Sequence, residues 1–248
     1  MTSSLLTVKC GGPGVRCDYE TLFIEPTLVP LDNWIDNTSN QLTPSRCYQD
    51  LFNSEYRHTE TLKDHAIMYV HDDVTFHEPN WRERVMTLFE CNPRIVCVGL
   101  GGAIALGNRN LYKSRYRINN LARQGYVSNQ TDWQVHGGHE TGAKRVAVVD
   151  AFFMAVRASF LSEVGGWPVE HLTHHCLDLW LACEAARRGK EVWMVGASCT
   201  HHGGGSSTKP AYEQAWWLQG GTLESDHQIP HRWLYEEYRD VLPIEVRS

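Results

Sequence analysis

Short apolar runs recur along the chain and are separated by polar or helical segments. The clearest run is Ala66–Val70, which is too short for a soluble helix and is typical of a strand buried on both faces of a parallel sheet. The same pattern predicts further strands at Thr7–Cys10, Ile95–Val98 and Glu191–Val195. Arg145–Val156 predicts another buried strand region, which Asp150 interrupts.

Segments with helical periodicity alternate with these strands. We expect helices at Pro44–Leu51, Trp81–Cys91, Arg157–Val164 and Leu177–Arg188. Thr43 is placed to cap the first of them, and Gly165 and Gly189 are placed to end later ones. Strands that alternate with helices indicate an α/β fold, with a mostly parallel sheet and helices on both faces.

The length of 248 residues suits a single domain over residues 1–248, and no repeat or linker divides it. We expect residues 208–248 to form helices that pack over the sheet. The net charge of −6 gives no general attraction to nucleic acid or to an anionic membrane, so any basic surface has to be local. No apolar run approaches the length of a membrane span and no signal pattern opens the chain, so we expect a cytoplasmic protein without membrane contact.

Residues 107–145 differ from the rest of the chain because they are polar and lack a clear period. Their cationic side chains are interleaved with three tyrosines: Arg109, Lys113, Arg115, Arg117 and Arg123, with Tyr112, Tyr116 and Tyr126. We expect a long excursion from the sheet with one helix around residues 113–124. Excursions of this length are usually functional or disordered. A solvated basic face is the alternative.

Two adjacent carboxylates, Asp72 and Asp73, follow one residue after the run Ala66–Val70. An unpaired charge is costly inside a buried strand, so the pair is expected at the carboxyl end of that strand, where open α/β sheets bind ligands. Successive side chains of an extended chain point to opposite sides. One carboxylate is therefore expected to hold a hard cation and the other a hydroxyl-rich group. A solvated turn is the simpler alternative.

Other polar residues also follow predicted strands, and one opens a predicted helix. They are Asp36, Asp150, His201 with His202, and the helix residue Asp178. Strand ends on one edge of a parallel sheet converge, so these groups can share one cleft. A carboxylate with an imidazole suits Mn²⁺ or Mg²⁺, which would act as a Lewis acid on a departing diphosphate.

The order of these motifs resembles a family 2-type glycosyltransferase of the Rossmann-like GT-A fold. The resemblance covers roughly residues 33–207. It is carried by Ile35–Ser39, His71-Asp72-Asp73, Val149–Arg157, Val164–Trp167, His175–Asp178 with Gly189, and His201–Ser206.

The resemblance implies a donor site for a nucleotide-sugar, most often a UDP-sugar. Asp36 would lie beside the uracil, Asp72 would contact the ribose, and Asp150 would hold sugar hydroxyls. Gly203 and Gly204 belong to a loop that can close over the phosphates with little steric hindrance.

The resemblance also implies the metal and the base. Asp73 and His201 would bind the ion, with His202 as the substitute for His201. Asp178 takes the place of the general base that deprotonates the acceptor hydroxyl for an inverting, in-line displacement. The dipole of its helix favours the ionised carboxylate. A simple helix cap is the alternative for Asp178.

The acceptor has to be inferred from residues outside the shared core. The chain resembles phage enzymes that glycosylate hydroxymethylated pyrimidines in DNA, whose target base has to be flipped out of a duplex. Arg115 and Arg117 suit phosphates flanked by stacked bases, and we expect Trp167 and His175 to contact the acceptor as well. A bacterial surface glycan and a protein side chain are the competing acceptors.

Two readings from other classes stay open at this point. One is a non-catalytic domain that binds a nucleotide-sugar, in which Asp178 would be dispensable. The other is a metal hydrolase built on the histidines. Purely structural roles are the alternative for two of the candidate residues. Asp150 would then be a buried carboxylate with its hydrogen bonds made, and His175 an ordinary buried histidine.

Overall fold

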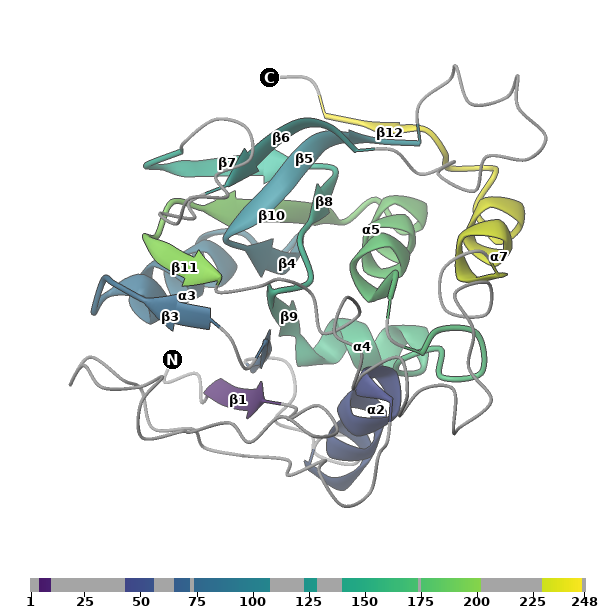
Figure 1. Ribbon diagram of the computed structural model, residues 1–248, viewed down its shortest axis with the longest axis horizontal. Coiled ribbons are helices and arrows are strands. Elements are labelled where there is room, and N and C mark those ends of the chain that lie inside the picture. Colours follow the sequence, from purple (N-terminus) through teal and green to yellow (C-terminus); the bar gives the residue numbers. More distant parts are fainter. Residues whose placement is uncertain are drawn as a thin grey trace, which may run out of the picture.

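A mixed six-stranded sheet forms the centre of the protein. The computed structural model describes residues 5–9, 43–55, 65–71, 74–107, 123–128, 140–173, 175–201 and 229–246. The order of strands across the sheet is β1–β2–β9–β4–β10–β7 (Figure 1). Their bounds are Leu5–Lys9 (β1), Ala66–Val70 (β2), Ile95–Gly99 (β4), Ala143–Val146 (β7), Phe153–Arg157 (β9) and Glu191–Val195 (β10).

The α/β class is confirmed, but the sheet is mixed rather than mostly parallel. β1, β2, β4 and β10 run in one direction, whereas β9 is antiparallel to both β2 and β4, and β7 is antiparallel to β10. The physical reason for the error is that an apolar run reports burial of both faces and says nothing of strand direction. Helices cover both faces of this sheet, so an antiparallel strand at its centre is as apolar as a parallel one.

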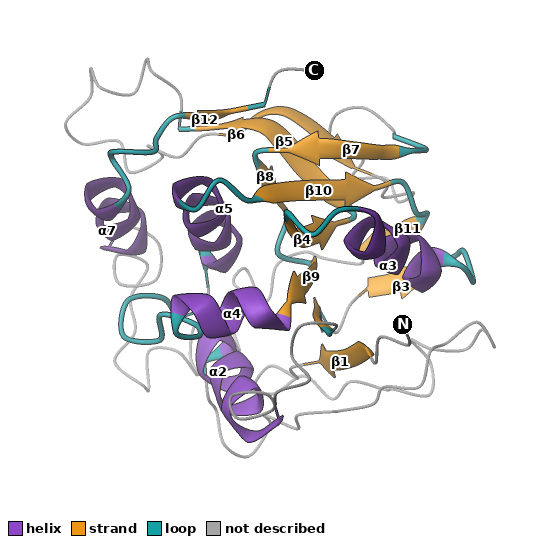
Figure 2. Ribbon diagram, turned by 180° about the vertical axis from the view of Figure 1, so that it is seen from behind, coloured by secondary structure: helices purple, strands orange, loops and turns teal. Residues whose placement is uncertain are grey.

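Helices lie on both sides of the sheet, as predicted. They are α2 (Pro44–Glu55), α3 (Trp81–Cys91), α4 (Ala158–Val164), α5 (Leu177–Arg187) and, outermost, α7 (Ile229–Glu237). In Figures 1 and 2, α2, α4 and α5 lie on one side of the strands and α3 lies on the other. The side chains of β2 alternate accordingly: Ile67 and Tyr69 pack with the α5 side, and Met68 and Val70 pack with α3.

The predicted start and stop residues of the helices have the expected geometry. Oγ1 of Thr43 accepts a hydrogen bond from the backbone N–H of Arg46 at 3.4 Å, at the start of α2. Gly165 and Gly166 end α4 with φ angles of 86° and 93°. A Cβ on Gly166 would lie 2.4 Å from Oε1 of Gln49, so this position excludes other residues by both its backbone and its surroundings.

Several short antiparallel strands were not predicted. They are β3 (Val74–Phe76) with β11 (Cys199–His201), and β5 (Gly101–Leu106) with β6 (Arg123–Ser128) and β12 (Ile244–Glu245). β8 (Val148–Val149), which also pairs with β5, lies within the predicted strand region Arg145–Val156. β6 lies inside the polar excursion. The helix expected around residues 113–124 is therefore wrong at residues 123 and 124, which belong to β6. Residues 108–122 lie outside the described part.

The predicted C-terminal packing helices are represented by α7, whose Leu234 is buried against the core, as is Tyr238 just after it. Residues 208–228 lie outside the described part. Among the helices that are described, none is both long and apolar enough to cross a membrane. The assignment of residues 1–248 to one domain and the cytoplasmic location stay predictions.

Candidate functional site

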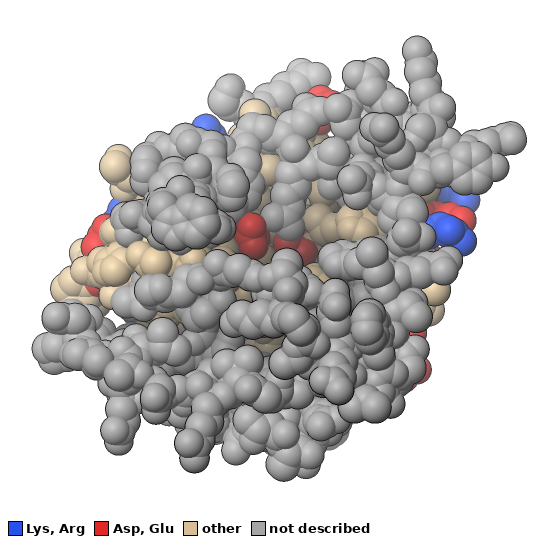
Figure 3. All heavy atoms as spheres, in the orientation of Figure 1, with Lys and Arg blue, Asp and Glu red and all other residues tan. Residues whose placement is uncertain are grey.

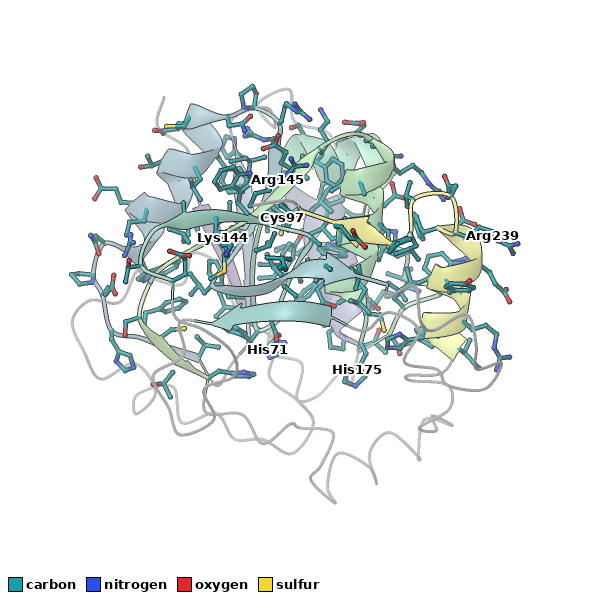
Figure 4. All side chains as sticks on the ribbon, turned by 90° about the horizontal axis from the view of Figure 1, so that it is seen from above. His71, Cys97, Lys144, Arg145, His175 and Arg239 are labelled. Atoms are coloured by element: carbon teal, nitrogen blue, oxygen red, sulfur yellow. The ribbon has the colours of Figure 1, made fainter. Side chains whose placement is uncertain are left out.

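The candidate site lies at one edge of the central sheet. Val70 at the end of β2 pairs with Phe153 at the start of β9, and Gly99 at the end of β4 pairs with Met154 of the same strand. The carboxyl ends of β2 and β4 therefore meet the beginning of β9. His71 follows β2 at this edge, and Figure 4 shows it on the same side of the ribbon as His175.

His201 is brought to the end of β2 by the ribbon formed from β3 and β11. In that ribbon His201 is the register partner of Val74. Its Nε2 also lies 3.4 Å from Nδ1 of His71. His71 and Val74 are the described neighbours of Asp72 and Asp73 on either side in the sequence, while the two aspartates themselves lie outside the described part.

Phe152 connects the two histidines. Its backbone carbonyl accepts the N–H of His71 at 2.9 Å. Its ring stacks on His201 with a centroid distance of 5.1 Å and an interplanar angle of 19°. The residue is fully buried, so it fixes the ring of His201 and the backbone of His71 against the core.

Asp150 is placed in the turn between β8 and β9. Its N–H donates to the carbonyl of Gly101 at 2.9 Å, and its carboxylate Oδ1 accepts the N–H of Phe152 at 3.4 Å. This turn fixes the orientation of the half-buried Asp150 side chain. Asp150 is thereby linked through Phe152 to His201.

Asp178 lies in the first turn of α5 and is only 4% exposed. Its Oδ1 accepts the N–H of Leu179 at 2.9 Å. Burial raises the pKa of the Cys97 thiol, and the nearby charge of Asp178 raises that pKa further, which places the carboxylate close to β4. α5 also contacts β8, the strand that leads directly into Asp150. In the space-filling view of Figure 3, acidic residues are visible near the middle of the face that Figure 1 shows.

Trp167 belongs to the core. It is 3% exposed, and its indole N–H donates to Oη of Tyr69 at 3.0 Å. The centroid of its ring lies 5.3 Å from that of Trp180 in α5. His175 is half-buried, just before Cys176, whose φ of 70° lies in the left-handed region. The predicted roles of Trp167 and His175 in acceptor binding stay predictions.

The remaining predicted site residues lie outside the described part of the chain. They are Asp36, Asp72, Asp73, Arg115, Arg117, His202, Gly203 and Gly204. His71 and Phe152 lie within motifs that carry the family resemblance, but no role was predicted for either. The signal for His71 was available, since a polar residue that ends an apolar run beside two carboxylates is itself exposed to the same site.

The protein has a mixed α/β fold, and its candidate site lies at the carboxyl ends of β2 and β4. Residues 53–233 match the glycosyltransferase-like family, and because this match covers most of the chain, the protein belongs to that family and is a glycosyltransferase. No curated protein matches the chain. Among solved structures, the crystal structure of A197 from STIV matches with 15% identity and a TM-score of 0.43, over 79% of this chain and 84% of that chain.

Proposed function

We propose that this glycosyltransferase moves a sugar from a nucleotide-sugar, specifically a UDP-sugar, to an acceptor hydroxyl in a metal-dependent reaction that inverts the anomeric carbon. One observation carries the proposal. His201 lies beside both His71 and Val74, the residues that flank Asp72 and Asp73 in the sequence. A carboxylate from this pair and a distant imidazole would suit a site for Mn²⁺ or Mg²⁺.

Asp73 and His201 are the residues that would hold the ion, with His202 as the substitute for His201. A divalent ion bound there supplies positive charge that stabilises the departing diphosphate. Asp72 would bind the ribose, and Asp36 would lie beside the uracil. Gly203 and Gly204 would close over the phosphates.

The chain's own residues carry out the proton transfer and the orientation of the sugar. Asp178 accepts the proton of the acceptor hydroxyl as the acceptor oxygen forms its bond to the anomeric carbon. The bond between that carbon and the diphosphate oxygen breaks, and UDP leaves with the electron pair. Asp150, fixed by its turn, holds the sugar hydroxyls during this displacement. The burial of Asp178 favours the transfer because it keeps competing water away from the carboxylate.

For the acceptor we propose the hydroxymethyl group of a modified pyrimidine in DNA. The support comes from the sequence: a stretch of basic side chains and tyrosines, with Arg115 and Arg117 at its centre, on a chain whose net charge is −6. Phosphate contacts and base stacking require these two kinds of side chain together. Trp167 and His175 are further acceptor-binding residues in this proposal. A bacterial surface glycan and a protein side chain are the acceptors against which it has to be tested.

The test is release of nucleotide from a panel of nucleotide-sugars with Mn²⁺. Each donor is assayed alone, with hydroxymethylated DNA, with unmodified DNA of the same sequence, and with a glycan acceptor. The proposal predicts release from a UDP-sugar that depends on the hydroxymethylated DNA. Release from no donor would overturn the nucleotide-sugar reaction, and release that responds only to the glycan would overturn the DNA acceptor.

A matched pair of variants tests the base in the same assay. Asp178→Asn keeps an oxygen that can accept the N–H of Leu179 but cannot take up the acceptor proton. Asp50→Asn makes the same change at an exposed position of α2 and serves as the control. We expect Asp178→Asn to retain UDP-sugar affinity and lose turnover, whereas Asp50→Asn stays active. Equal activity of the two variants would remove Asp178 from the mechanism.

A further inference from the structure

We propose that His71 is a second imidazole ligand of the divalent ion and that, together with His201, it makes the site favour transition ions such as Mn²⁺ or Co²⁺ over Mg²⁺. This inference rests on the proposed function, because it takes the metal site to lie at the end of β2. It goes further in assigning a ligand that neither the motif order nor the family match identifies.

The separation of the two ring nitrogens supports a shared ion. Nδ1 of His71 lies 3.4 Å from Nε2 of His201. This distance is at the long end for a direct hydrogen bond between the rings, like the 3.4 Å bonds accepted by Thr43 and Asp150. Two nitrogen ligands that each lie about 2.1 Å from one ion are roughly 3.0–3.4 Å apart, depending on the angle between them. The observed separation falls in that range.

The core fixes the ring of His201 and the backbone of His71. The carbonyl of Phe152 accepts the backbone N–H of His71, and the ring of Phe152 stacks on the ring of His201. The pairing of β3 with β11 fixes the backbone of His201 opposite Val74. Contacts that fix a ligand before the ion binds reduce the entropy lost on binding. His201 and the backbone of His71 are therefore in position without an ion.

The chemistry of the two ligands determines the preferred ion. Imidazole nitrogen suits transition ions, Co²⁺ and Zn²⁺ more than Mn²⁺, whereas Mg²⁺ prefers an octahedron of oxygen ligands. Within the described residues, no group of three or more His, Cys, Asp or Glu side chains is placed to hold an ion. The pair thus needs further ligands, for which we expect Asp73 and the diphosphate oxygens of the donor.

The test measures metal binding directly and not through turnover. Chelator-treated protein is titrated with Mn²⁺, alone and with UDP, and electron paramagnetic resonance reports the bound ion. Electron spin-echo modulation then detects the ¹⁴N nuclei bound to it. We expect two imidazole nitrogens in the wild type and one in His71→Ala, with a loss of Mn²⁺ affinity of about 10- to 100-fold. Affinity for Mg²⁺, measured by competition, should change by less than about threefold because nitrogen contributes little to that ion.

His77→Ala is the matched control. His77 follows β3, is exposed, and its Nε2 lies 2.8 Å from Oγ1 of Thr200, so this variant also removes one imidazole contact to the same ribbon. It should keep both nitrogens on the ion. His71→Gln provides a second, more conservative variant in case His71→Ala unfolds, and it should also bind the ion with one imidazole.

Three results would overturn the proposal: no bound Mn²⁺ with or without UDP, two coordinated imidazoles in both His71 variants, or equal losses of Mn²⁺ affinity in His71→Ala and His77→Ala. These failures are distinguishable from failure of the proposed function. A protein that binds Mn²⁺ through two imidazoles but releases no nucleotide would disprove the reaction and keep the ligand assignment. A protein that transfers the sugar but binds Mn²⁺ through a single imidazole would disprove the ligand assignment and keep the reaction.

Discussion

The two sides of the candidate site are built differently. On one side, His201 is carried by the short ribbon of β3 and β11 and contacts the stacked ring of Phe152 and the imidazole of His71. On the other side, Asp178 begins α5, a helix packed into the core and supported from outside by α7. Oη of Tyr238 donates to Glu184 of α5, and Arg187 binds Glu237 across the same contact at 3.0 Å.

This difference indicates that the two sides respond to different changes. In the proposed reaction the ribbon side would supply ligands of the ion, so an excess of that ion should compensate for the loss of one ligand. The α5 side would supply the proton acceptor, which no concentration of ligand replaces. Residues on the α5 side belong to the larger of the two buried hydrophobic clusters, so their burial contributes more to the free energy of unfolding than that of the smaller cluster.

The largest expected effect compares Asp178→Asn with His201→Ala across a range of Mn²⁺ concentrations. Asp178→Asn should lower kcat by about 10²- to 10⁴-fold at every concentration, because proton transfer is lost. His201→Ala should lower activity at limiting Mn²⁺ and recover much of it at excess Mn²⁺, because only ion affinity is weakened. Steady-state kinetics measure both. Rescue of Asp178→Asn by Mn²⁺ would contradict the division between the two sides.

A second comparison measures how tightly the α5 side is packed. Gly165→Ala should destabilise the protein by about 1–2 kcal/mol, because alanine is strained at a φ of 86° and nothing else lies nearby. Gly166→Ala has the same kind of backbone strain at a φ of 93° and in addition forces its Cβ against Gln49, which should cost about 1–3 kcal/mol more. Denaturant unfolding measures the free energies. Equal losses would show that Gln49 moves aside without cost.

The smallest expected effect concerns the buried hydrogen bond between Trp167 and Tyr69. Trp167→Phe and Tyr69→Phe each remove one partner of the bond, which spans 3.0 Å inside the core. We expect the double-mutant cycle to give a coupling energy of about 0.5–1.5 kcal/mol. Thermal and denaturant unfolding of the four proteins provide the values. A coupling near zero would indicate that the bond adds nothing beyond ring packing.

The sequence predicted the parts of the fold that local pattern controls. β2, α3 and β10 have the predicted bounds, and α2, α4 and α5 agree within a few residues. Burial and capping are properties of neighbouring residues, so a short window contains them. The direction of β9 and the pairing of β3 with β11 depend on contacts between distant segments, and no local window contains those.

The site shows the same limit at the level of single residues. Asp150 and Asp178 were identified because each follows a strand or opens a helix, and both have these positions in the structure. Their predicted roles stay predictions. No role was predicted for His71 or Phe152, because their contacts with His201 cross more than a hundred residues or depend on ring stacking. Trp167 is buried in the core, and its predicted role in acceptor binding stays a prediction.

β9 is synthesised after both strands that it joins. Ile67 of β2 pairs with Val156, and Cys97 of β4 pairs with the same residue, so these two strands are joined in the sheet through β9. While the ribosome is still adding the intervening residues, the nascent chain carries two apolar strands with open edges that face no partner. We expect this interval to be the one in which the newly made protein is most prone to aggregate and most dependent on chaperones.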